Sequence, residues 1–260
     1  MTQLDRIESK LDRLLQAHGL EQSAPLTRVT FNETFGRNFV ATETGFVKGT
    51  VPVWRDRFRW PRKDVINGEL QVYAAFNAWN FSLTKSGLSI LAQRDSRSPD
   101  EFSSGVITTE KLFKQQYGWF EMKARLPKGP GLAPAFWLYP ADEIWPPEID
   151  IMEANGQNWL HVAVHQTLSD SDFSQFVYAD KINVHDGKYH KFACEWRKDF
   201  IAFYLDDVKY AEVFGHGVHE PMYLIINLAV GSDRPEWIPH PPADAKFPAA
   251  LDIEYVRVMN

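Results

Sequence analysis

Cysteine is nearly absent from this sequence, because Cys194 is the single one among 260 residues. One thiol excludes an intramolecular disulfide, and a chain of this length can bury a sizeable hydrophobic core instead. In the stretch KFACEWR, Cys194 alternates with Phe192 and Trp196, as residues on one face of a strand do. We therefore expect Cys194 to be buried in that core.

Long apolar runs are also missing. No stretch reaches the roughly 18 apolar residues that a membrane span requires, and residues 1–20 are charged rather than signal-like. We expect no membrane partner and synthesis as a soluble protein in the cytoplasm. An extracellular or virion-associated location would then depend on lysis, on incorporation into a virion or on a leaderless exporter.

An excess of basic residues is the third absence. The formal net charge is −6, and no long run of lysine or arginine occurs. Nucleic-acid binders need a positive surface to neutralise phosphates, so this class of partner is excluded. A neutral or weakly charged ligand fits the composition better.

Helical periodicity is confined to the start of the chain. An a/d seam at 3-4-3 spacing is formed there by Leu4, Ile7, Leu11 and Leu14. It predicts an amphipathic helix over residues 1–22, although two heptads are marginal for an isolated coiled coil. Two alternatives stand: a surface helix packed on its own domain, or a short helix that makes a homo-oligomer or docks a partner through residues 2–20.

From Val29 onward the chain consists of short segments rich in β-branched and aromatic residues, separated by Gly, Pro, Asn or Asp. Examples are GLSILAQR, YGWFEMKARLP, LHVAVHQ and MYLIINLAV. Several alternate apolar and polar residues, as half-buried antiparallel strands do. The pattern predicts an all-β domain over residues 23–260, folded as a two-sheet antiparallel β-sandwich of jelly-roll type.

Three carboxylates stand close together in the segment PPEIDIMEANG. Glu148 and Asp150 are two residues apart, so on a strand they share one face, while the isoleucines beside them point into the core. Strict alternation would place Met152, not Glu153, on the acidic face. Only a β-bulge, which accommodates one extra residue, brings Glu153 onto that face and turns Met152 inward.

Carboxylates on one face repel one another, so the arrangement is costly without a use. Retaining glycoside hydrolysis requires it, because one ionised carboxylate attacks the anomeric carbon while a second, protonated one delivers a proton to the leaving oxygen. A middle aspartate can hydrogen-bond the nucleophile and hold the protonation states apart. The alternatives are an acidic strand edge without function and a lectin-like module that binds sugars without cutting them.

The segment EIDIME matches the E-x-D-x-x-E signature of glycoside hydrolase family 16, in the bulged form of its laminarinase, agarase and carrageenase branches. Further blocks resemble the family in its order: NGELQVY (67–73), YGWFEMKARLPKG (117–129), PAFWLYP (134–140), VAVH (162–165), HKFACEW (190–196), FYLDD (203–207), YLIINLAVG (223–231) and LDIEYVRV (251–258). The resemblance covers residues 28–260. It implies a concanavalin A-like jelly roll and a retaining enzyme that needs no cofactor for catalysis.

The resemblance also assigns roles to residues. It implies that Glu148 is the nucleophile, Asp150 its assisting carboxylate and Glu153 the general acid/base. Candidate substrate-binding residues are Trp137, His165, Asn67, Trp145 and Trp237. Members of the family often hold a structural calcium on the convex side of the sandwich. The residues at the corresponding positions of this sequence, and so the candidate calcium ligands, are Glu33 and Asp252. A surface salt bridge or a cap is the alternative for each of these two.

Trp137 matches the family's aromatic platform beside the cleaved bond, and the alternative is a tryptophan in the sandwich core. His165 matches a histidine near the acid/base. A metal at His161 and His165 is not favoured, because VAV between them indicates a strand and no acidic third ligand stands beside them. Further candidate platforms are Trp54, Trp60, Trp79 and Tyr73.

Two departures from the laminarinase pattern bear on the substrate. Ala133 in GLAPAFW removes a stacking tryptophan, and Val106 in SSGVITT stands where laminarinases tend to carry arginine. The segment WPPEIDIMEANGQ is closer to bacterial exopolysaccharide glycanases, such as those that trim succinoglycan. We expect an endo-β-glycanase for internal β-1,3 or mixed β-1,3/1,4 linkages of a glucan or related exopolysaccharide. A galactan hydrolase of agarase or carrageenase type and a non-catalytic glycan-binding module are the alternatives.

Overall fold

The computed structural model describes residues 26–36, 39–42, 45–60, 66–75, 79–94, 101–169 and 172–260. The predicted helix over residues 1–22, with its apolar seam, lies outside these described residues. Within them, no helix combines the length and the apolar composition that crossing a membrane demands.

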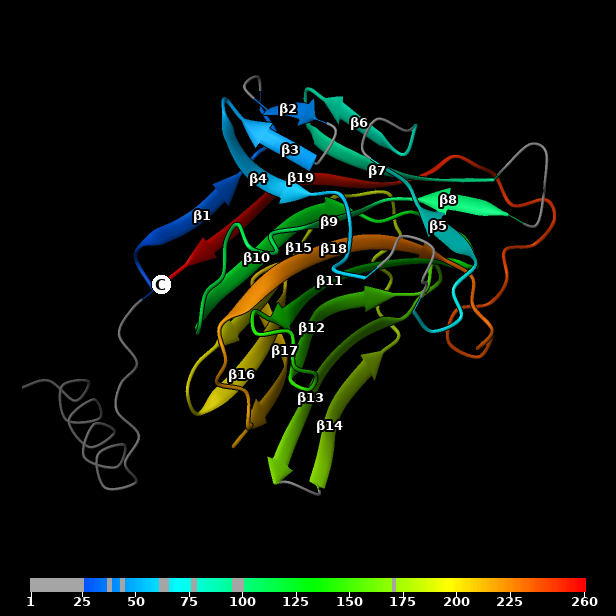
Figure 1. Cartoon of the computed structure of the whole chain (residues 1–260). Coiled ribbons are helices and arrows are strands. Elements are labelled where there is room, and N and C mark those ends of the chain that lie inside the picture. Colours follow the sequence, from blue (N-terminus) through cyan, green and yellow to red (C-terminus); the bar gives the residue numbers. More distant parts are fainter. Residues whose placement is uncertain are drawn as a thin grey trace, which may run out of the picture.

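The described residues form two sheets (Figure 1). The ten-stranded sheet contains β1 (Val29–Glu33), β5 (Gln71–Tyr73), β6 (Phe81–Thr84), β7 (Gly87–Arg94), β8 (Phe102–Ser104), β10 (Gly118–Arg125), β15 (His190–Trp196), β16 (Phe200–Leu205), β17 (Val208–Phe214) and β19 (Ala249–Met259). The nine-stranded sheet contains β2 (Phe39–Thr42), β3 (Gly45–Lys48), β4 (Val51–Arg55), β9 (Val106–Thr108), β11 (Leu132–Pro140), β12 (Glu148–Ala154), β13 (Leu160–Ser169), β14 (Asp172–Asp180) and β18 (Met222–Val230). The predicted all-β sandwich is thereby confirmed.

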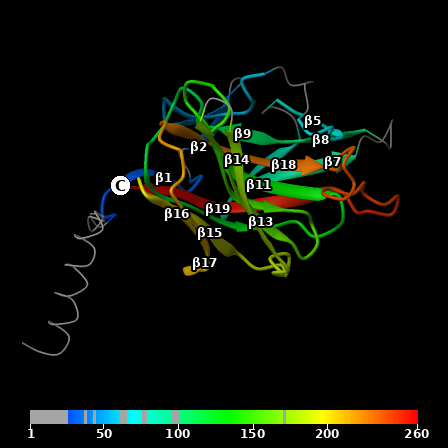
Figure 2. The same ribbon diagram turned by 90° about the horizontal axis from the view of Figure 1, so that it is seen from below.

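The order of the strands differs from their order along the chain. The larger sheet runs β17-β16-β15-β10-β19-β7-β8-β5, with β1 added on β19 and β6 on β7. The smaller runs β14-β13-β12-β11-β18-β9-β4-β3-β2. Both views place the C-terminal end of β19 beside the start of β1 (Figures 1 and 2), where Arg28 and Asn260 exchange backbone hydrogen bonds.

One pairing departs from the predicted antiparallel pattern. Strand β5 pairs with β8 in parallel, with Gln71 opposite Phe102. The two strands are short and are joined through β6 and β7, and this connection is long enough to return the chain in the same direction. The sequence offers no local signal for this direction, because both strands are only three residues long.

Alternating side chains fill the space between the sheets. Phe120 and Met122 of β10 and Val256 and Val258 of β19 are fully buried there, each contributing about 1.5–3 kcal/mol of transfer free energy. Cys194 is also fully buried in this core, as predicted.

Strand β18 is buried along its whole length, on both faces. Its inward side chains, such as Ile226, belong to the sandwich core. Its outward side chains, such as Tyr223 and Ile225, belong to a second apolar cluster on the other side of the sheet. Strand β18 is therefore covered on both sides, and the second cluster forms a floor for the site described next.

Candidate active site

Strand β12 carries the three carboxylates, and its register with both neighbours is irregular. Against β11, the residues opposite Asp150 and Met152 are adjacent, so Ile151 is the extra residue. Against β13, a second irregularity lies between Asp150 and Glu153. Ile151 and Met152 are both buried in the core, whereas Glu153 shares a cleft with Asp150. The predicted bulge and the inward turn of Met152 are confirmed.

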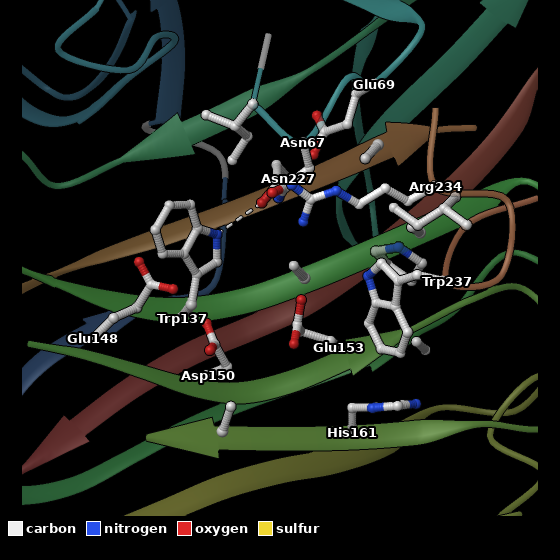
Figure 3. A pocket seen from close by; sticks show the side chains of 18 of the residues that line it. Asn67, Glu69, Trp137, Glu148, Asp150, Glu153, His161, Asn227, Arg234 and Trp237 are labelled. Atoms are coloured by element: carbon white, nitrogen blue, oxygen red, sulfur yellow. Dashed lines mark hydrogen bonds between the residues drawn. The ribbon is translucent and has the colours of Figure 1, made fainter. Parts of the chain in front are cut away.

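A cleft of about 730 Å³ lies over the three carboxylates, within the usual size range of ligand sites. Figure 3 shows Glu148, Asp150 and Glu153 along one strand, all facing this space. The other walls come from β11, β13 and β18 and from the loops before β5 and after β18. The cleft therefore joins segments that are far apart in the sequence.

His165 on β13 links two of the carboxylates. Its Nε2 atom lies 3.1 Å from Asp150 Oδ2 and 3.7 Å from Glu148 Oε1. These three side chains place ligand-type atoms within 4.8 Å of one another. The sequence indicated no acidic third ligand beside the pair His161 and His165, but two acids of the neighbouring strand do stand beside His165. His161 stands opposite Glu153 instead and is outside that group.

Burial raises the pKa values of all three carboxyl groups, and the charge of Asp150 raises those of Glu148 and Glu153 further. At Glu148, the nearby His165 and a hydrogen bond from Trp145 lower the pKa, whereas at Glu153 only His165 does so. Neighbouring buried carboxylates resist ionising together. The site therefore holds fewer than three negative charges at neutral pH.

Trp137 on β11 forms part of the cleft floor. Its indole Nε1 donates a hydrogen bond to Asn227 Oδ1 at 2.8 Å, and its ring centroid lies 6.0 Å from those of Phe58 and Tyr139. It belongs to the second apolar cluster and lines the cleft. Trp137 is therefore a buried tryptophan that also lines the cleft, and the core that buries it is the second cluster rather than the one between the sheets.

The other predicted substrate-binding residues also line the cleft. Asn67 is exposed before β5, Trp145 is about half exposed before β12, and Trp237 is half-buried after β18. The ring centroids of Trp237 and His161 are 3.9 Å apart, nearly at right angles. The fold thus gathers the five predicted substrate-binding side chains around the three carboxylates.

The further candidate platforms separate into three kinds. Trp60 lines the cleft. Trp54 is buried in the sandwich core, and Tyr73 is buried beneath the cleft floor. Trp79 is 87% exposed and is not among the described residues that line the cleft. Alternation along a strand could not distinguish these cases, because each depends on which segment packs above the ring.

The two departures from the laminarinase pattern now have a structural setting. Ala133 packs with Ala229 and Ile238, and Trp237 lies against this small cluster. An aromatic ring is therefore present at this wall, but it comes from the loop after β18 rather than from β11. Val106 is fully buried within the cleft-floor cluster, so this position brings no cation into the cleft.

The two predicted calcium ligands, Glu33 and Asp252, interact with different partners. Glu33 Oε1 accepts a hydrogen bond from the Phe35 amide at 2.6 Å, and Asp252 forms an ion pair with Arg125 at 2.7 Å. Glu33 stands opposite Val256, four residues along β19 from Asp252, a separation of about 13 Å along a strand. The structure does not bring the two carboxylates together, and the calcium site stays a prediction.

Sequence reasoning missed three cleft residues, Glu69, Asn227 and Arg234. Asn227 offered a signal, because it is a polar residue in the middle of an apolar strand and is buried. Glu69 lies in the block NGELQVY, which resembled the family but suggested no role for this residue, and Arg234 lies in a loop without a recognisable pattern. Their loops are held together, since the Asp233 amide donates to the Gly68 carbonyl at 3.0 Å.

Gly68 permits this close approach of the two loops. Its φ of +62° is a left-handed conformation that favours glycine. A Cβ atom at this position would lie 2.1 Å from Cγ of Asp233. A side chain at residue 68 would therefore be strained by the left-handed backbone and would displace the Asp233 carboxylate.

Comparisons with known proteins agree with this geometry. The model of the Glycosyl hydrolases family 16 matches residues 63–239. Endo-1,3-1,4-beta-glycanase EglC of Rhizobium meliloti is 34% identical over 94% of this chain and 55% of its own length. A beta-glucanase of Rhodothermus marinus is 31% identical over 74% of each chain.

A solved structure is similar as well. A non-specific endo-beta-1,3(4)-glucanase superposes with a TM-score of 0.75 at 25% identity, covering 91% of this chain and 98% of its own. The chain spans only about half the length of EglC. The family match nevertheless covers more than half of this chain and includes the segment EIDIME. The chain belongs to family 16 of the glycosyl hydrolases.

Proposed function

We propose that the chain is a retaining endo-β-glycanase that hydrolyses internal β-1,3 or mixed β-1,3/1,4 linkages of a glucan or a related exopolysaccharide. One observation carries the proposal: the bulge in β12 turns Glu153 onto the cleft face that Glu148 and Asp150 occupy. Membership of the family and the activities of EglC and of the glucanase structure support it.

The first chemical step uses the two glutamates. The Glu148 carboxylate attacks the anomeric carbon, the glycosidic bond breaks, and Glu153 gives its proton to the leaving oxygen. Water then attacks the same carbon of the glycosyl-enzyme, its proton passes to Glu153, and Glu148 departs as a carboxylate. Two displacements at one carbon retain the anomeric configuration, and the net reaction adds one water molecule.

Asp150 and His165 act on the charge distribution. Asp150 lies between the two glutamates and repels a second negative charge at either of them. The imidazole of His165 faces both Asp150 and Glu148. Together these groups keep the cluster below three negative charges, and the first step uses the state in which Glu148 is ionised and Glu153 is protonated.

The aromatic side chains give the cleft its preference for sugars. Trp137 on the floor and Trp145 and Trp237 on the walls present apolar surfaces on which the faces of pyranose rings pack. The aromatic ring at the cleft wall near Ala133 comes from Trp237, not from residue 133. We therefore expect the cleft to accept a polysaccharide whose shape differs from that of plain β-1,3-glucan.

Substitution of the carboxylates tests the assignment. Glu148→Gln and Glu153→Gln should each abolish release of reducing ends while the thermal unfolding transition persists, and Asp150→Asn should reduce turnover less. Near-wild-type activity in either glutamine variant would overturn the roles given to the glutamates.

Product analysis tests the substrate class. Laminarin, curdlan, lichenan, succinoglycan, agarose and carrageenan would be incubated with the protein, and the products separated by mass. We expect oligosaccharides from the first four and none from the two galactans. Tight retention on a glycan without new reducing ends would favour a binding module instead.

A further inference from the structure

Glu69 is a fourth acidic side chain of the cleft that the proposed reaction does not use. It precedes β5, is 7% exposed, and lines the cleft together with the three carboxylates. Among the described residues, no lysine, arginine or histidine forms an ion pair with it. Burial of a carboxyl group without a cation is unfavourable, so its position calls for an explanation.

The Oε2 atom of Glu69 ends a chain of hydrogen bonds. It accepts from Gln71 Nε2 at 2.6 Å and from the Tyr73 hydroxyl at 3.2 Å. The Tyr73 oxygen accepts from Asn227 Nδ2 at 2.9 Å. Asn227 Oδ1 in turn accepts from the Trp137 indole at 2.8 Å, the bond drawn as a dashed line in Figure 3. Four side chains from three distant segments are thus connected from Glu69 to the cleft floor.

The chemistry of the groups fixes the direction of this chain. An indole nitrogen can only donate, so Asn227 must turn its oxygen toward Trp137 and its amide group toward Tyr73. The Tyr73 hydroxyl then accepts from the amide and has its proton left to donate, and Glu69 receives it. Burial raises the pKa of Tyr73 well above its ordinary value, which keeps that proton in place.

We propose that Glu69 is a positioning residue, which through Tyr73 and Asn227 holds the Trp137 indole in the orientation that packs against the sugar at the bond being cleaved. The inference rests on the proposed function, because it concerns how the same cleft holds a glycan. Tyr73 lies beneath the floor and does not line the cleft, so it acts on the substrate only through the side chains that it holds, among them Trp137.

Tyr73→Phe removes the central hydroxyl while keeping the ring. Tyr210→Phe is its matched control, since the Tyr210 hydroxyl is buried on β17 and has no hydrogen-bond partner among the residues that the structure describes. We expect kcat/KM on lichenan and laminarin to fall about tenfold in Tyr73→Phe, the effect of about one lost hydrogen bond, and to stay at the wild-type value in Tyr210→Phe. Equal kcat/KM in the two variants would overturn the proposal.

Two substitutions of Glu69 separate positioning from simple support of the fold. In Glu69→Gln the side-chain oxygen still accepts a hydrogen bond from Tyr73, so kcat/KM should stay within about threefold of the wild-type value. In Glu69→Ala this acceptor is lost, and kcat/KM should fall at least tenfold. Each variant would also be made in the Glu148→Gln background, and its dissociation constant for laminaritetraose measured by calorimetry. We expect weaker binding in Glu69→Ala and Tyr73→Phe only.

The outcomes distinguish the two proposals. A lower melting temperature in Tyr73→Phe with unchanged kcat/KM and unchanged affinity would mean that these hydrogen bonds only support the fold. That result would overturn the positioning role of Glu69. If the wild-type protein cut no β-glycan, the proposed function would fail, but the binding measurement would still test whether Glu69 positions Trp137.

Discussion

Glu153→Gln should stabilise the fold at neutral pH while it abolishes turnover. Burial and the charge of Asp150 raise the pKa of Glu153 from 4.5 to about 8. Between these two values the folded state binds more protons than the unfolded state, so the stability of the wild-type protein falls as the pH rises through this window. A glutamine stays neutral at every pH and escapes this loss.

The size of the gain follows from the same numbers. At pH 7 an unfolded glutamate has lost its proton while the folded one largely keeps it, which lowers the free energy of unfolding by at most about 3 kcal/mol. Glu153 lines an open cleft, where water screens the charges, so we expect about 1–1.5 kcal/mol. For a domain of this size this raises the melting temperature by about 2–6 °C.

Calorimetric unfolding of Glu153→Gln and the wild-type protein at pH 7 and pH 4 measures the effect. The gain should be present at pH 7 and nearly vanish at pH 4, where both states of the wild-type protein hold the proton. Glu236→Gln is the control, because Glu236 is an exposed carboxyl group at the same cleft and should give no gain. A gain of equal size at both pH values, or a loss at pH 7, would refute the reasoning.

Three further predictions concern the cleft. The kcat/KM on lichenan should decline above about pH 8, because Glu153 must hold its proton and its pKa is raised to about 8; an unchanged rate at pH 9 would contradict this. Ala133→Trp should cost about 1–3 kcal/mol by overpacking against Trp237, and Trp237→Ala in the same chain should restore most of the melting temperature. Deletion of Met152 should remove most turnover, because Glu153 then shifts relative to the bond that it protonates; wild-type turnover would count against the role of the bulge.

The site was predictable where its chemistry depends on neighbours in the sequence. The spacing of Glu148, Asp150 and Glu153 determined the bulge, since strand alternation allows no other way to place three acids on one face. The burial of Cys194 followed from alternation along its strand, and the burial of Met152 followed from the bulge. Both predictions rest on the period of a strand and on where the residues depart from it.

Contacts between distant segments were not predictable in the same way. The Glu69–Tyr73–Asn227–Trp137 chain depends on how β5 and β18 are placed relative to β11, and no local pattern encodes that placement. The acids beside His165 were overlooked because they lie on the adjacent strand. The parallel pairing of β5 with β8 is likewise a property of the connection rather than of either strand.

Strand β19 occupies the middle of the ten-stranded sheet, between β10 and β7, and also pairs with β1. During synthesis, β7 and β10 leave the ribosome long before residues 249–259 exist. Until then the edges of β7 and β10 that pair with β19 have unpaired backbone N–H and C=O groups, and such edges promote aggregation of nascent β-proteins. Completion of the sheet is thus a late event with high contact order, so we expect recovery of active protein to depend on slow translation or on chaperones that shield β7 and β10.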